Sequence, residues 1–262
     1  MASTTLSPNF LKFSISSFCS VLIIMLALWM APALRAQADA PSMRPFSRLG
    51  IDVNVGTLGI GAEVATPLAT RFNLRGSGNF FHYSTSTNQS GLTYIATLDM
   101  KSAQASLDWF PFGGSFHLSP GVMLYNGTKP VWSIQVPTNT SYSLNNVDYY
   151  SDPSDPLGGS FRVTFPMMGP QFTIGFGNMI PRKNSKHFSF PFELGFVYFG
   201  TGTTSSSFSG SACTAPNGVN CLPVSSYPGF QTDLAAEDAK IESYVKDARF
   251  YPILRMGLSY KF

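Results

Sequence analysis

The end of the chain alternates between apolar and polar side chains with a period of two, and this pattern constrains the fold more than any other feature. The even positions carry large apolar groups: Leu254, Met256, Leu258, Tyr260 and Phe262. The odd positions between them carry Arg255, Gly257, Ser259 and Lys261. Because successive side chains of a β-strand point to opposite faces, residues 254–262 are predicted to form a strand with one apolar face.

The same alternation recurs along most of the chain. Between residues 188 and 198 the even positions again carry large apolar groups: Phe188, Phe190, Phe192, Leu194, Phe196 and Tyr198. Similar patterns occur at residues 72–80, 103–109, 116–124 and 172–176. An all-β protein is therefore predicted.

The polar faces of these strands indicate which side meets water. They carry Gly, Ser, Gln, Asn and isolated charges, and only 12% of the whole chain is charged, about half the usual share. These residue types suit the narrow interior of a closed antiparallel up-and-down transmembrane β-barrel whose apolar face contacts lipid. The competing fold is a soluble secreted β-sandwich, which would carry Lys, Glu, Thr and Asn on the second face.

The N-terminus has the features of an export signal. Lys12 precedes an apolar run at residues 21–30, and Ala36-Gln37-Ala38 forms a small-x-small cleavage site. We expect residues 1–38 to be removed after export through the Sec pathway, and a single membrane anchor is the alternative. Residues 39–47 are then a linker, and residues 48–262 form the barrel domain.

The last strand also resembles a known family signal. A strand that ends in Phe262, with Tyr260 and Leu258 in alternation before it, resembles the C-terminal insertion signal of bacterial outer-membrane β-barrel proteins. Four further segments are similar to a group of uncharacterised small, OmpA-type eight-stranded barrels of Gram-negative bacteria: 107–112 (LDWFPF), 117–121 (HLSPG), 177–182 (GNMIPR) and 250–252 (FYP). The resemblance implies an outer-membrane location, contact with lipid and lipopolysaccharide, and insertion by the barrel-assembly machinery. It implies no activity.

Eight strands are predicted. They cover about residues 48–55, 58–66, 71–84, 94–110, 115–126, 160–178, 187–200 and 248–262. The apolar phase reverses at Gly56-Thr57, which indicates a tight hairpin; a bulge there would instead require a strand from residues 131–150. Short connections are expected on the periplasmic side and long outer loops at 84–91, 126–158 and 201–248. A helix at 232–246 is expected to cap the barrel mouth.

Seven charged residues fall on the predicted inner face of the barrel. They are Asp52, Glu63, Arg75, Asp108, Glu193, Arg255 and Lys261. An eight-stranded barrel is only wide enough for its own side chains, and a buried unpaired charge is costly. Four acids facing three bases therefore predict a salt-bridged plug rather than an open pore.

The outer surface offers one candidate for catalysis. His82 and Ser84 share a strand face, and this His-x-Ser pair resembles the dyad of outer-membrane lipid A deacylases, in which imidazole acts as base for the serine hydroxyl. No carboxylate near His82 is evident in the sequence, and Thr85 stands where those enzymes have Asn. An aromatic interface belt explains His82 equally well.

Other classes of function find no support in the sequence. Removal of residues 1–38 leaves 15 basic and 14 acidic residues, so no basic field for nucleic acid exists. Neither zinc-ligand spacing nor a nucleotide-binding loop is present, so no metal or cofactor is expected. Cys213 and Cys221 are close together in an exported chain and are expected to form a disulfide. The predicted function is a membrane scaffold whose loops are available to an extracellular ligand; the alternatives are an esterase and a narrow solute channel.

Overall fold

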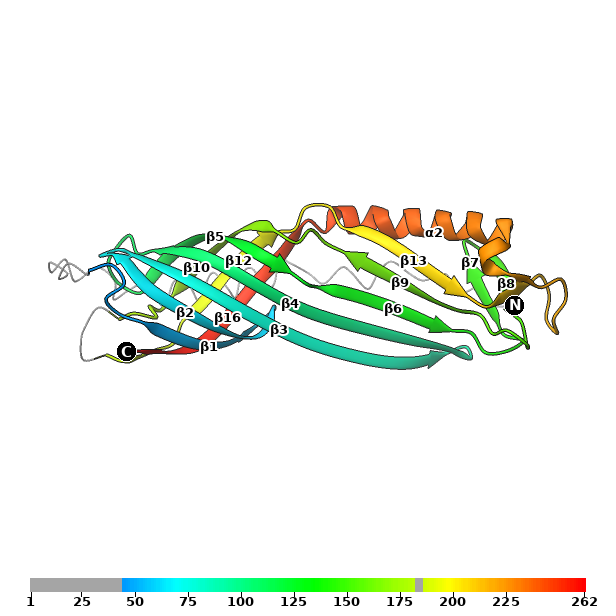
Figure 1. Ribbon diagram of the computed structural model, residues 1–262, viewed down its shortest axis with the longest axis horizontal. Coiled ribbons are helices and arrows are strands. Elements are labelled where there is room, and N and C mark those ends of the chain that lie inside the picture. Colours follow the sequence, from blue (N-terminus) through cyan, green and yellow to red (C-terminus); the bar gives the residue numbers. More distant parts are fainter. Residues whose placement is uncertain (1–43, 182–185) are drawn as a thin grey trace, which may run out of the picture. The chain divides into compact units, whose positions relative to one another are not determined.

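Strands in lipid must satisfy every backbone hydrogen bond among themselves, which a sheet achieves by closing on itself. The computed structural model describes residues 44–181 and 186–262, and within them eight antiparallel strands form a closed barrel (Figure 1). Their order is β1 (Gly50–Gly56), β2 (Gly59–Ala69), β3 (Phe72–Gln89), β4 (Leu92–Trp109), β5 (Phe116–Asn126), β10 (Gly169–Phe176), β12 (Phe192–Tyr198) and β16 (Phe250–Lys261). Pairing of β1 with β16 closes the ring, and β11 (Phe188–Ser189) also pairs with β16. The predicted fold class is confirmed.

The hairpin between β1 and β2 establishes the strand count. Gly56 lies opposite Gly59, and Thr57 and Leu58 form the turn between them. Gly59 has a φ of 99°, and a Cβ there would lie 2.3 Å from the carbonyl oxygen of Phe80. Only glycine fits such a conformation and approach. The predicted tight hairpin is confirmed, and the alternative of a bulge is wrong.

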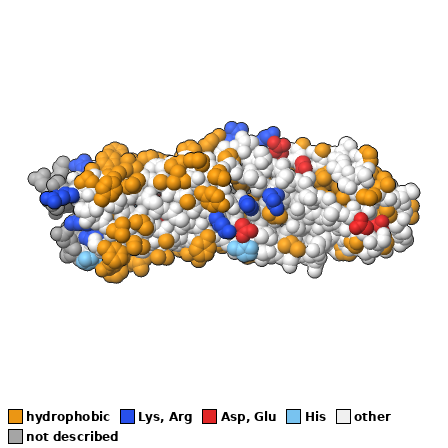
Figure 2. Space-filling model, viewed as in Figure 1, with side chains coloured by type: hydrophobic (Ala, Val, Ile, Leu, Met, Phe, Trp, Pro, Cys, Tyr) orange, Lys and Arg blue, Asp and Glu red, His pale blue; other side chains and the backbone are white. Residues whose placement is uncertain are grey.

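Burial alternates along the barrel strands as the sequence pattern predicts. In β16, Leu254 and Met256 are 41% and 54% exposed, whereas Arg255 between them is 7% exposed. Figure 2 shows hydrophobic side chains gathered over the barrel strands, and charged side chains where this belt ends. The apolar face of the barrel therefore points outward.

Beyond the barrel, the chain builds a second structure, which we call the head (residues 82–99, 129–164 and 201–248). The ends of β3 and β4 continue into a sheet with β6 (Lys129–Gln135), β9 (Gly158–Thr164) and β13 (Thr203–Ser209). A smaller sheet contains β7 (Ser141–Leu144), β8 (Val147–Ser151), β14 (Ser211–Cys213) and β15 (Leu222–Pro223). The 3-10 helix η2 (Val224–Ser226) and the helix α2 (Pro228–Asp247) complete the head.

The sequence predicted loops where the head forms strands. β3 reaches Gln89 and β4 begins at Leu92, so only Ser90 and Gly91 remain as a turn, with φ values of 53° and 81°. Such left-handed pairs form the tight hairpin turns that match strand twist. Several head strands are short or rich in Ser and Thr. Their periodicity is therefore too weak to read.

The head has an apolar core of its own. It contains the buried side chains of Leu92, Ile134, Val136, Leu144, Tyr149, Leu157, Ala212, Val224, Phe230 and Leu234. The helix predicted before the last strand is confirmed, but α2 begins at Pro228, a residue suited to the first helical turn. Its buried residues pack into the head core, and α2 lies along β13 rather than across the barrel mouth (Figure 1).

The predicted disulfide between Cys213 and Cys221 is present in the head. No helix in the described part of the chain is both long and apolar enough to cross a membrane. The expected signal peptide at residues 1–38 lies outside the described residues, as does most of the linker at 39–47.

Candidate functional site

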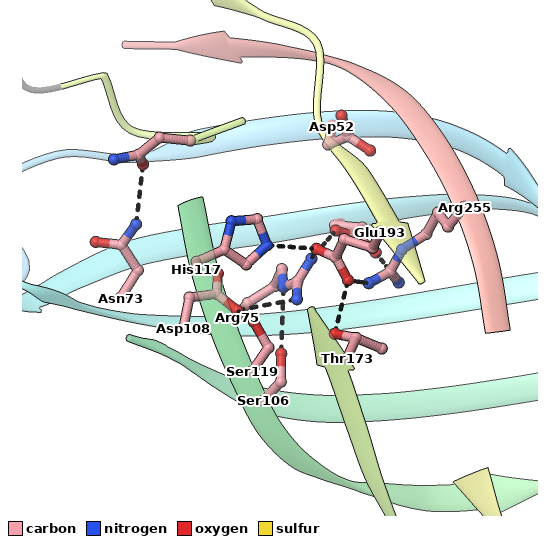
Figure 3. Close-up of polar contacts among 12 residues, drawn as sticks. Asp52, Asn73, Arg75, Ser106, Asp108, His117, Ser119, Thr173, Glu193 and Arg255 are labelled. Carbon is pink, nitrogen blue, oxygen red and sulfur yellow. Dashed lines mark hydrogen bonds and ion pairs between the residues drawn. The ribbon is translucent and has the colours of Figure 1, made fainter. Parts of the chain in front are cut away.

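Arg75 is at the centre of an ionic network inside the barrel (Figure 3). It occupies an inward position of β3, and its Nη1 lies 3.1 Å from Oε2 of Glu63 while its Nη2 lies 2.9 Å from Oδ1 of Asp108. A third ion pair joins Arg75 to Glu193. One guanidinium therefore contacts three carboxylates that come from three other strands, β2, β4 and β12.

A second guanidinium compensates two of these carboxylates. Arg255 lies directly opposite Glu193 in the β12–β16 register, and its Nη2 is 2.5 Å from Oε2 of Glu193. Arg255 also forms an ion pair with Glu63. The bases and acids alternate in space, which is the arrangement that offsets the cost of removing charges from water.

Neutral side chains complete the hydrogen bonding of the network. Thr173 donates from Oγ1 to Glu193 at 3.0 Å, and Ser119 donates to Asp108 at 2.7 Å. Nε2 of His117 lies 3.2 Å from Glu193, and Ser106 accepts a bond from Nε of Arg75 at 3.2 Å. Sequence reasoning missed these partners because it counted charges alone. Their inward strand positions were the available signal.

Two inward glycines make room for these long side chains. A Cβ on Gly175 would lie 2.5 Å from Nε2 of His117, and a Cβ on Gly257 would lie 2.4 Å from Oδ1 of Asp52. Both distances are far below van der Waals contact. The small residues on the polar faces therefore leave the volume that the charged side chains fill.

The other two predicted lumen charges lie at different points of the interior. Asp52 is 1% exposed, lies opposite Glu63 in the β1–β2 register, and accepts a hydrogen bond from Nδ2 of Asn54 at 3.3 Å. Lys261 is 3% exposed at the end of β16, where its ammonium donates to the carbonyl oxygen of Pro181 at 3.1 Å.

Apolar side chains cover the network on both sides. Toward the head, a buried cluster contains Leu58, Met100, Met123, Val197, Phe199 and Ile253. Toward the other end, Phe110 is 1% exposed with its ring centroid 5.3 Å from that of His117, and a small cluster contains Ala65, Met179 and Ile180. The ions are thus shielded from water along the barrel axis.

This arrangement favours a structural role for the lumen charges. The five residues that form ion pairs with one another are at most 7% exposed, so a substrate has no path to them among the described residues. Among all the described residues, one group has the side-chain types and spacing of metal ligands: Asp152 with Cys213 and Cys221, in the head. The two cysteines are joined in the disulfide and offer no free thiol.

The candidate dyad lies on the outward face where the barrel meets the head. Nδ1 of His82 is 2.5 Å from Oδ1 of Asp99, its direct cross-strand neighbour. Ser84 hydrogen-bonds with Oγ1 of Thr97 at 3.2 Å. A carboxylate near His82 was not evident in the sequence, but the structure has one beside it. Asp99 follows it by 17 residues and becomes a neighbour only through the strand register.

The residues of the expected insertion signal line the outer face of β16 and the chain end. Leu254, Met256, Leu258, Tyr260 and Phe262 are all exposed. The ring centroid of Tyr260 lies 5.1 Å from Phe188 and 4.9 Å from Phe262. Aromatic groups thus gather at the barrel end that holds the C-terminus, as in the interface girdles of outer-membrane barrels.

A closed eight-stranded barrel with charges inside and an apolar belt outside is the architecture of the small outer-membrane β-barrel proteins. Two solved structures share this fold. The crystal structure of Acinetobacter baumannii CarO is 20% identical, covers 84% of this chain and 98% of its own, and gives a TM-score of 0.51. The crystal structure of A. baumannii CarO2 is 17% identical, covers 84% of this chain and 100% of its own, and gives a TM-score of 0.53. No family model and no curated protein matches the sequence. The chain is therefore CarO-like in fold, with a closed eight-stranded antiparallel β-barrel.

Proposed function

We propose that the protein is a sealed outer-membrane barrel that anchors the head at the cell surface, and that the head is its interaction surface. The burial of the lumen charges carries this proposal. Glu63 and Glu193 are each 1% exposed, and Arg75 is 3% exposed. An aqueous pore would hydrate the charges that line it. These ions are paired with one another and covered by apolar side chains.

The lengths of the connections support the orientation. The chain end and the short connections between β2 and β3 and between β4 and β5 lie at one end of the barrel, and the head lies at the other (Figure 1). Barrels of this class have short periplasmic turns and long extracellular connections. The head would then face the medium after export by the Sec pathway and insertion by the barrel-assembly machinery. It would be available to an extracellular ligand.

Protease accessibility on intact cells tests the orientation. A protease recognition site inserted at 216–218, an exposed turn of the head, should be cut by external protease. The matched control carries the same site at the turn 113–114, at the opposite end of the barrel, and should be cut only after the cells are opened. The reverse result would contradict the proposed orientation.

Electrical recording tests whether the lumen is sealed. Purified protein in planar bilayers should give no stepwise conductance, because the ionic network and the apolar layer block the axis. A narrow solute channel is the competing function. It would be supported by reproducible openings whose amplitude changes in a Ser119→Ala variant, which alters the lumen without removing a charge.

An esterase is a second candidate because the structure supplies the carboxylate that orients His82. The imidazole of His82 is held by Asp99 at 2.5 Å, and Ser84 follows on the same strand face. Mass spectrometry of lipid A from cells with and without the protein tests this activity. Deacylation would give lighter lipid A, and the change should disappear in Ser84→Ala and Asp99→Asn. An identical spectrum with and without the protein would exclude it.

A further inference from the structure

Three cationic side chains face outward at the border between the apolar belt and the head. They are Lys101 on β4, Lys129 on β6 and Arg162 on β9, and all three are exposed. Toward the other end of β4, the outward positions are Ala103, Ala105, Leu107 and Trp109, which are apolar without exception. Phe80, directly opposite Lys101, is 62% exposed. The cations therefore stand where the lipid-facing surface ends.

The strand register places these cations next to one another. Lys129 lies opposite Asp99, which is two residues from Lys101 on the same face of β4. Arg162 lies opposite Val131, which is two residues from Lys129 on the same face of β6. One step to the next strand and two residues along it correspond to about 8 Å between successive cationic positions. Lysine and arginine side chains can span such gaps and share a ligand.

The charges of this cluster are not balanced by the protein. Within residues 44–181 and 186–262, the side chains of Lys101, Lys129 and Arg162 form no hydrogen bond or ion pair. The nearby carboxylate, Asp99, is engaged by His82. With His82 neutral, the cluster carries a net charge of about +2. Figure 2 shows blue side chains close together at the edge of the orange belt.

We propose that Lys101, Lys129 and Arg162 bind the phosphate groups of lipid A in the outer leaflet. The inference rests on the proposed orientation, which places this border at the level of the lipopolysaccharide head groups. Long cationic side chains beside an apolar surface keep their stems in the lipid and their charges at the interface. Lipid A combines acyl chains, which match the belt, with phosphates, which match the unpaired cations. The charge and the height of the cluster in the membrane thus select the same partner.

Binding of purified protein in a nonionic detergent tests the proposal. Native mass spectrometry would measure the affinity for bisphosphorylated lipid A and for the same lipid A after dephosphorylation. The double variant Lys101→Gln/Lys129→Gln should bind the phosphorylated lipid about 25-fold more weakly, since each surface cation contributes about fivefold to such binding. Its affinity for the dephosphorylated lipid should not change. The charge-conserving variant Lys101→Arg/Lys129→Arg should bind the phosphorylated lipid as tightly as the unaltered protein. Asp99→Asn, which removes the nearby negative charge, should bind it more tightly.

A matched variant separates this site from the overall charge. Arg44→Gln/Lys186→Gln removes two exposed cations at the opposite end of the barrel and should bind lipid A as the unaltered protein does. Equal losses in both double variants, or equal affinity of the unaltered protein for both lipids, would overturn the proposal. So would full competition by millimolar inorganic phosphate, which would indicate a site for a free anion. Because this assay is independent of orientation in the cell, a failed protease experiment and a failed lipid site remain distinguishable.

Discussion

The barrel and the head are built with opposite interiors by the same antiparallel chain. At the level of the ionic network, the buried groups include Arg75, Glu63 and Glu193, and the large apolar side chains of residues 254–260 face outward. Inside the head, the buried groups include Leu144 and Phe230. The strands are geometrically alike in both regions. What differs is the medium around them, since lipid accepts the apolar face and water accepts the polar one.

This contrast predicts that the two regions fail for different reasons. The barrel interior depends on charge compensation, so it is sensitive to the loss of one ion. The head depends on close apolar packing, so it is sensitive to a cavity. The described residues provide one tryptophan for each region, Trp109 in the barrel and Trp132 in the head. Variants with Trp109→Phe or Trp132→Phe would therefore report on each region separately by fluorescence.

The largest effect is expected from Arg75→Ala. Its loss leaves Glu63 and Glu193 with Arg255 alone, and it removes the guanidinium that pairs with Asp108 among the described residues. Removing one partner of a buried ion pair costs about 3–5 kcal/mol, so the free energy of unfolding of the barrel should fall by about 4 kcal/mol. Urea titration in detergent, read from Trp109 and from the heat-dependent shift on gels, measures it. The exposed control Arg162→Ala should cost less than about 0.5 kcal/mol. Equal losses in the two variants would contradict the role of the network.

A smaller effect, confined to the head, is expected from Leu144→Ala. Leu144 is 1% exposed in the head core, and its truncation leaves a cavity. Such truncations cost about 2–5 kcal/mol, and about 3 kcal/mol is expected here. The urea midpoint from Trp132 should move and that from Trp109 should not. Leu222→Ala removes the same atoms from a site in the head that is 46% exposed, and it should leave both midpoints in place. A shift of both midpoints by Leu144→Ala would show that barrel and head unfold as one unit.

How well each region can be predicted from sequence follows the same contrast. The barrel strands were predictable because lipid on one side and a narrow lumen on the other force a strict alternation, as in β16. The reversal of phase at Gly56-Thr57 was sufficient to predict the first hairpin. The head strands were predicted as loops because several of them are short or rich in Ser and Thr, so few large apolar side chains mark their alternation. Residues 203–209, for example, hold a single large apolar side chain, Phe208.

The parity of a position predicts which residues enter the lumen, but it does not predict their partners. Glu193 meets Arg255 because β12 pairs with β16 in one register, and Arg75 reaches Glu193 across the lumen from a strand 118 residues away. His82 meets Asp99 because β3 pairs with β4 in one register. Contacts of this kind depend on register and on closure of the ring, which no local pattern contains.

An effect of about 2 kcal/mol is expected when the disulfide is removed. Cys213 and Cys221 close a short loop in the head, and a crosslink over so few residues restricts the unfolded chain only modestly. The double variant Cys213→Ser/Cys221→Ser should lower the stability reported by Trp132 and leave Trp109 unaffected. Reductant should reproduce this loss in the unaltered protein and have no further effect on the variant. An unchanged Trp132 midpoint would show that the bond does not stabilise the head.

The smallest effect is expected from an acid-sensitive contact between α2 and β8. Tyr149 donates from its hydroxyl to Oδ2 of Asp233 at 2.6 Å, and Asn145 donates to Oδ1 at 3.1 Å. These two hydrogen bonds lower the pKa of Asp233 below its ordinary value. A carboxyl whose pKa is lower in the folded state stabilises the fold above its ordinary pKa, and this stabilisation is lost as the pH falls through the lowered one. The head midpoint, read from Trp132, should therefore decline as the pH falls below about 4. Asp233→Asn should reduce this decline. Substitution of Arg75 should not alter it, because Arg75 and its ion-pair partners lie inside the barrel. If Asp233→Asn left the acid dependence of Trp132 unchanged, the contact would not contribute to the stability of the head.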